Sequence, residues 1–159
     1  MYLVAIVDMY SRMIVGYRLS NSLCTESCKS ALEDALLKYG TPLILNSDKG
    51  SQFTSESWVK TLVHYEIKIS MTGKGRCADN VYVERLWRAF KYEGSYLYQW
   101  NTVEDLKSTI TKWVYWYNYN RPHQSLNYST PAETLYKAYS SNSIYLNFKD
   151  LNIAQEVKM

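Results

Sequence analysis

Several features that would place this chain in a special class are missing from its 159 residues. The three cysteines are Cys24, Cys28 and Cys77, and this odd number with irregular spacing argues against a disulfide scaffold. Cys24 and Cys28 lie four positions apart, but no second Cys or His pair completes a zinc site. We therefore interpret the cysteines as small buried or half-buried side chains.

The sequence also lacks the apolar segments that direct a protein to a membrane. No basic region precedes the apolar residues 2–7, so they do not resemble a signal peptide. No apolar run approaches the roughly 20 residues that span a bilayer. We expect a soluble, cytoplasmic protein with no membrane partner.

The chain contains no internal repeat and no low-complexity stretch, and its length suits one domain. A net charge of +3 permits a polyanionic partner but does not demand one, because many unrelated proteins carry a similar charge.

Hydrophobic patterning predicts an α/β fold with a mixed sheet. Strands are expected at residues 2–7, 13–17, 42–45 and 67–70, the first two as an antiparallel hairpin. Helices are expected at residues 26–38, 55–63, 79–92 and 102–119, with a short one starting at Pro131. Thr102 with Asp105 predicts a capping box, and Pro131 suits a first helical position. Residues beyond 140 give no clear pattern.

Asp48 directly follows the apolar strand 42–45 and precedes Gly and small polar residues. A carboxylate at the carboxyl end of a strand is well placed at an open sheet edge, where ligands bind. The alternative is an Asx-type turn that leads into the next helix.

Glu84 lies within the expected helix 79–92, on the same face as Asn80, Arg88 and Lys91. The alternatives to a functional role are a solvated charged face or a Glu84–Arg88 ion pair between successive turns. Residues 117–123 similarly allow two interpretations, a helix end with a C-terminal cation or a phosphate-binding segment.

Four segments together resemble the integrase core of bacterial insertion-sequence transposases, which are close kin of retroviral integrases. They are residues 7–16, 47–53, 70–84 and 117–133, in the family's order. The second and third contain Asp48 and Glu84, with 35 residues between them. The resemblance covers residues 1–138 and leaves 139–159 as a C-terminal tail.

The resemblance implies a ribonuclease-H-like mixed sheet flanked by helices and two-metal phosphoryl transfer on DNA. It implies that Asp48 and Glu84 are catalytic ligands of Mg²⁺ or Mn²⁺, which prefer oxygen donors. It also implies transposon-end and target DNA as partners, with self-association or binding to a full-length transposase. The implied nucleic-acid contacts, each with an ordinary surface residue as the alternative, are Lys74, Arg76, Asn80, Arg88, Lys91, Arg121 and His123.

One part of the family pattern is missing, namely the first aspartate, in an Asp-x-Thr triplet on the first strand. None of the six Asp residues has Thr two positions later, and Asp8 matches the family's second strand instead. We therefore expect a core that starts one strand late and leaves strand edges exposed. Such a chain would be marginally stable and inactive.

Three hypotheses follow from this departure. The first is a truncated, inactive transposase core. The second is an active enzyme whose first strand is absent from this sequence. The third is a non-catalytic DNA-binding or oligomerisation module that modulates a full-length transposase.

Overall fold

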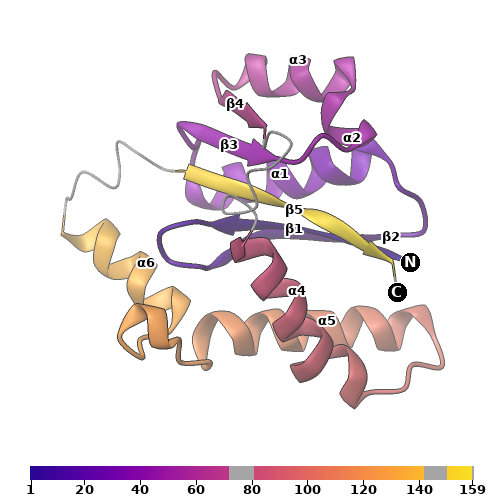
Figure 1. The fold of residues 1–159 in the computed structure, drawn as a ribbon, viewed down its shortest axis with the longest axis vertical. Coiled ribbons are helices and arrows are strands. Elements are labelled where there is room, and N and C mark those ends of the chain that lie inside the picture. The colour runs from indigo at the N-terminus through magenta and orange to yellow at the C-terminus, as the bar shows by residue number, and fades with distance from the viewer. Residues whose placement is uncertain (72–80, 142–149, 159) are drawn as a thin grey trace.

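A five-stranded mixed sheet forms the centre of the computed structural model, which describes residues 1–71, 81–141 and the backbone of 150–158 (Figure 1). The strand order is β2-β1-β5-β3-β4. The strands are β1 (Tyr2–Asp8), β2 (Ile14–Ser20), β3 (Ile44–Ser47), β4 (Lys68–Met71) and β5 (Asp150–Lys158). The α/β prediction is confirmed.

The predicted hairpin is present as β1 paired antiparallel with β2, with Ala5 opposite Tyr17. Residues 3–8 of β1 are all buried, because helices cover the sheet on both sides. This explains the uninterrupted apolar run at the start of the sequence, since a strand covered on both faces has no solvent-facing side.

The last strand in the sequence, β5, occupies the middle of the sheet (Figure 1). It runs antiparallel to β1, with Ile6 opposite Ile153, and parallel to β3, with Asn46 opposite Asn152. No sequence pattern predicted a strand here. Residues 150–158 therefore belong to the same sheet as the hairpin, and the domain boundary near residue 138 stays a prediction.

The missing first strand was expected to leave its neighbours with exposed edges, but β5 lies between β1 and β3. As a result, β1 pairs with β2 and β5, while β3 pairs with β5 and β4. The expected exposed edges at β1 and β3 are therefore not present. The expectation of marginal stability loses its physical basis, because a paired strand does not leave its backbone N–H and C=O groups open.

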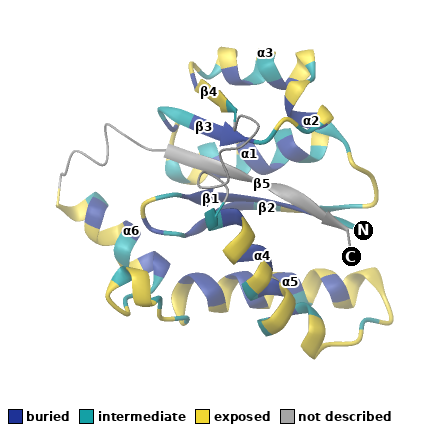
Figure 2. Ribbon diagram, in the orientation of Figure 1, coloured by how far each residue is buried: buried dark blue, intermediate teal, exposed yellow. Residues whose placement is uncertain are grey.

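Helices cover both faces of the sheet, α1 (Thr25–Tyr39) and α3 (Glu56–His64) on one and α4 (Val81–Glu93) and α5 (Val103–Tyr119) on the other (Figures 1 and 2). Val4 and Ile6 of β1 pack with Leu32 of α1 and Trp58 of α3. Leu3, Ala5 and Val7 point the other way and pack with Phe90 of α4 and Trp113 of α5. The remaining helices are α2 (Ser51–Thr54) and α6 (Pro131–Ser140). The short 3₁₀ turns are η2 (Ser95–Leu97) and η3 (Gln124–Leu126).

The helix starts follow local sequence signals. Thr102 and Asp105 form the predicted capping box of α5, and Pro131 is the first residue of α6. Ser55 caps α3 by accepting a hydrogen bond from the Trp58 backbone N–H. These contacts satisfy N–H groups that have no partner within the helix.

Asn118 fixes α5 against the edge of the sheet. Its side-chain oxygen accepts from the Ile14 backbone N–H, and its amide nitrogen donates to the Ile14 carbonyl, both at 2.9 Å. Asn118 is buried, so the amide takes the place of a neighbouring strand for this one residue of β2. The motif at residues 117–123 therefore contains a structural contact.

We expect Asn118→Ala to lower the free energy of unfolding by about 2–3 kcal/mol, because it leaves two buried backbone groups without partners. Urea denaturation followed by tryptophan fluorescence measures the change. Asn120→Ala is the matched control, since Asn120 is exposed at the end of the same helix. Equal effects of the two substitutions would contradict the role assigned to Asn118.

Candidate active site

Asp48 lies immediately beyond the carboxyl end of β3, next to the central strand β5. It is half-buried, and its Oδ1 accepts a hydrogen bond from the Gly50 backbone N–H at 3.0 Å. This is the Asx-type turn that the sequence offered as the alternative. A carboxylate accepts several bonds at once, so the turn orients Asp48 and does not exclude a ligand role.

Glu84 lies in the first turn of α4 and is exposed. The opposite side of α4 is anchored in the core by its four buried residues, Val83, Leu86, Trp87 and Phe90. Among the ion pairs of the described residues there is none between Glu84 and Arg88. The ion-pair alternative therefore does not hold, and the Glu84 carboxylate faces solvent.

The described residues contain no group of three or more His, Cys, Asp or Glu side chains that could together hold a metal ion. Asn46 lies opposite Asn152, so continuing the parallel register places Ala154 opposite Asp48. Residues 151–155 are Leu, Asn, Ile, Ala and Gln, none of which is acidic.

Asp8 has a role in the turn between β1 and β2. It is buried, and its Oδ2 accepts from the Ser11 backbone N–H at 2.8 Å and from the Ser11 hydroxyl at 2.5 Å. These bonds tie the end of β1 to the start of the turn.

The residues predicted to contact nucleic acid lie in different parts of the structure. Arg88 and Lys91 are exposed on α4, as the helix pattern predicted. Arg121 is held by Glu93, which accepts from Nε at 2.7 Å and from Nη2 at 2.6 Å. Lys74, Arg76 and Asn80 lie outside the described residues.

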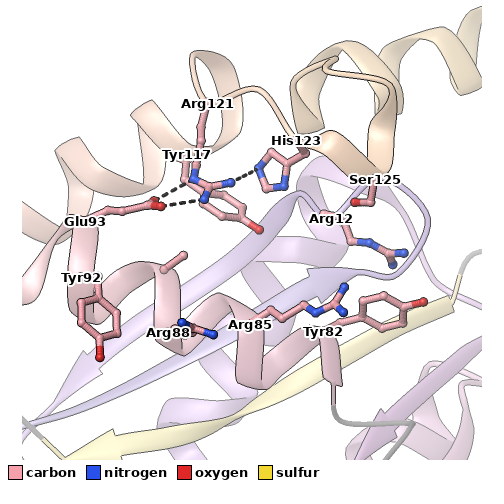
Figure 3. A pocket seen from close by; sticks show the side chains of 11 residues that line it. Arg12, Tyr82, Arg85, Arg88, Tyr92, Glu93, Tyr117, Arg121, His123 and Ser125 are labelled. Atoms are coloured by element: carbon pink, nitrogen blue, oxygen red, sulfur yellow. Dashed lines mark hydrogen bonds and ion pairs between the residues drawn. The ribbon is translucent and has the colours of Figure 1, made fainter.

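A pocket of about 460 Å³ brings Arg121 and His123 together with Arg88 (Figure 3). The pocket members that were not predicted include Arg12 from the β1–β2 turn and Tyr82 and Arg85 from α4. The i, i+3 spacing of Tyr82, Arg85 and Arg88 could have predicted that they share one polar face of the helix. Arg12 gave no such signal, because only the hairpin brings it to α4.

Electrostatic and stacking contacts order this pocket. The Arg12 guanidinium lies over the Tyr82 ring, 3.5 Å from its centroid. Burial, followed by the positive charge of Arg121, lowers the pKa of His123 to about 4. His123 is therefore uncharged at neutral pH, and its Nε2 lies 3.5 Å from Nη1 of Arg121. Burial also raises the pKa of Tyr117 to about 12, so its hydroxyl stays protonated.

The sequence matches two family models described as integrase core domain, one over residues 1–77 and the other over residues 65–131. The chain belongs to the integrase core family. The first match includes Asp48 and the second includes Glu84, so the matched segments contain both carboxylates. The resemblance inferred from the four segments is confirmed.

A curated relative of this integrase core is the transposase InsK of insertion sequence element IS150 from Escherichia coli (strain K12). It is 29% identical over 141 residues, which cover 87% of this chain and 50% of the relative. The chain spans about half the length of the curated relatives it matches.

Solved structures with the same fold include the simian T-cell lymphotropic virus intasome, with a TM-score of 0.73 and 16% identity over 84% of this chain and 48% of that one. The HTLV-2 integrase catalytic core domain in complex with magnesium gives a TM-score of 0.58 and 20% identity, over 84% of each chain. The ribonuclease-H-like fold class is thereby confirmed.

Within residues 1–71, 81–141 and 150–158, none of the helices combines the length and apolar character that crossing a bilayer requires.

Proposed function

We propose that this integrase core is of the kind that serves DNA transposition by two-metal phosphoryl transfer, with Asp48 and Glu84 at the positions of two of the metal-binding carboxylates. The observation that carries the proposal is the placement of these two carboxylates. Asp48 lies at the end of β3 and Glu84 lies in the first turn of α4, and each is within a segment that an integrase core model matches. Transposon-end and target DNA are the proposed substrates, and the bacterial cytoplasm is the proposed location.

The donor chemistry fits a divalent cation in part. Asp48 and Glu84 supply the oxygen ligands that Mg²⁺ and Mn²⁺ prefer, but the third carboxylate of the two-metal scheme has no counterpart among the described residues. When bound, such a cation polarises a phosphoryl oxygen and lowers the pKa of its bound water. Asp48, oriented by its turn, and Glu84, fixed by the buried side of α4, hold the two ligand positions.

We further propose that the chain as it stands binds DNA without cleaving it. The proposal is supported by the absence of any acidic residue at positions 151–155 of β5, the strand beside Asp48. Asp48 and Glu84 alone would supply only two of the oxygen ligands that a divalent cation requires.

The alternative function is a non-catalytic module that binds DNA or a full-length transposase and modulates it. The arginine-lined pocket beside α4 favours this alternative, because it needs no metal. A second copy of the chain or the full-length transposase is the proposed protein partner.

Incubating the chain with supercoiled plasmid DNA and Mn²⁺ tests these proposals, with DNA binding measured in parallel by fluorescence anisotropy. We expect binding without nicking, and we expect Glu84→Gln to retain binding. Isothermal titration should detect weak Mn²⁺ binding that Asp48→Asn and Glu84→Gln each remove. Nicking that Glu84→Gln abolishes would overturn the proposed inactivity, and nicking that survives Glu84→Gln would overturn the assignment of Glu84.

A further inference from the structure

We propose that the basic pocket beside α4, formed around Arg12, Tyr82, Arg85 and Arg88, binds a backbone phosphate group of the DNA strand that reaches Glu84 (Figure 3). This inference rests on the proposed function, because it takes DNA to be the ligand. It adds a positively charged site of defined composition to the two carboxylates.

The pocket carries excess positive charge. Four arginines line it against one carboxylate, Glu93, and that carboxylate is already bound by two nitrogens of Arg121. Across the part of the chain that the structure describes, Arg12, Arg85 and Arg88 take part in no ion pair. Three guanidinium groups are thus left without a neutralising partner around one cavity, an arrangement that favours an anion.

Arg12 is positioned for this role before any ligand arrives. Its backbone is in the left-handed region, with φ at 65°, and its side chain donates to the Met9 carbonyl. Stacking over Tyr82 further restricts the guanidinium. A restrained arginine loses less conformational freedom when it binds phosphate than a free one does.

The pKa of His123 reflects the positive charge around the pocket. Its pKa lies at about 4 because burial is reinforced by the charges of Arg121 and Arg12, against which Glu93 acts only in part. An entering phosphate would oppose those positive charges and favour the imidazolium form. The expected direction is therefore a rise in the pKa of His123 when the pocket is occupied.

Helix geometry connects the pocket to the candidate active site. Successive helical residues are separated by about 100°, so Arg88 lies roughly 40° around α4 from Glu84 and Arg85 lies roughly 100° from it. Arg88 is thus the pocket residue of α4 that lies nearest to Glu84 around the helix. A DNA strand lying across Glu84 would meet Arg88 first and place a neighbouring phosphate by Arg85 and Arg12.

The test measures duplex DNA binding at several salt concentrations for Arg85→Gln and Arg12→Gly. Glycine accepts the backbone conformation of Arg12, and Arg85 is exposed, so both variants should fold. Arg18→Gln is the matched control, because it removes one positive charge at a site where Arg18 pairs with Asp34. We expect each pocket variant to weaken binding roughly five- to tenfold at 0.1 M salt and to reduce the salt slope by about 0.9, while the control changes neither.

Nuclear magnetic resonance of the histidine rings provides a second readout, since His64 and His123 are the two histidines. DNA should raise the pKa of His123, Arg85→Gln should suppress that rise, and His64 should not respond. Pocket variants that bind DNA like Arg18→Gln, with an unresponsive His123, would overturn the proposal.

Three further outcomes distinguish a site for DNA from one for free phosphate, and a failure of the pocket proposal from a failure of the proposed function. If inorganic phosphate raises the pKa of His123 at a lower concentration than the concentration of DNA phosphate groups that is needed, the site binds free phosphate and the DNA assignment fails. If the wild-type chain binds Mn²⁺ at Asp48 and Glu84 but the pocket variants bind DNA normally, only the pocket proposal fails. If the wild-type chain does not bind DNA, the proposed function fails with it.

Discussion

Removing residues 150–159 should abolish the cooperative unfolding of this chain. The deletion takes out β5, the middle strand of the sheet, and leaves β1 and β3 each with one neighbour. Since a domain of this size is stable by only about 5–15 kcal/mol, the loss of a whole central strand should exceed that margin. Thermal melting followed by circular dichroism, together with dye binding to exposed apolar surface, measures the result.

A chain lacking only residue 159 is the control, because the pairing of β5 with β1 extends to Lys158. It should melt like the wild type. Cooperative unfolding of the 1–149 chain, at the wild-type temperature and with the wild-type urea dependence, would show that β5 does not complete the sheet.

Placing an aspartate on β5 beside Asp48 should create the missing third ligand. The register puts Ala154 opposite Asp48, with Ile153 as its neighbour on the strand. Adjacent strand residues face opposite sides of a sheet, so only one of Ile153→Asp and Ala154→Asp should point towards Asp48. We expect that variant to bind Mn²⁺ roughly tenfold more tightly or better, because affinity for hard cations rises with the number of charged ligands.

Thermal stability in the presence and absence of Mn²⁺ distinguishes this gain from simple damage. An aspartate in the central strand lowers stability when no metal is present, and ligand binding to the folded state reverses that loss. The effective variant should therefore gain melting temperature with Mn²⁺, and adding Glu84→Gln should remove the gain. No metal response from either variant, or equal responses from both, would contradict the register beside Asp48.

Local sequence signals predicted much of the fold. The hairpin, the helix starts at Thr102 and Pro131, and the apolar face of α5 each depend on residues a few positions apart. Asp48 and Glu84 were proposed from the family resemblance, because their flanking segments and their separation agree with the family pattern. Predictions of this kind need no knowledge of which strands are neighbours.

The parts that were missed depend on contacts between distant segments. β5 lies beside β1 although the two are at opposite ends of the sequence, and the apolar content of residues 150–158 alone does not reveal a central strand. The basic pocket requires the β1–β2 turn to approach α4, which brings Arg12 to Tyr82. The role of Asn118 likewise appears only when α5 packs on β2.

The central claim is that this integrase core completes its sheet with its own C-terminal strand. Interstrand nuclear Overhauser effects test it most directly, because neighbouring strands bring backbone protons of facing residues close together. The account predicts contacts from β5 to both neighbours, between Ile6 and Ile153 and between Leu45 and Leu151, with slow amide exchange through β5. Contacts between β1 and β2 alone, with fast exchange from residue 150 onwards, would contradict it.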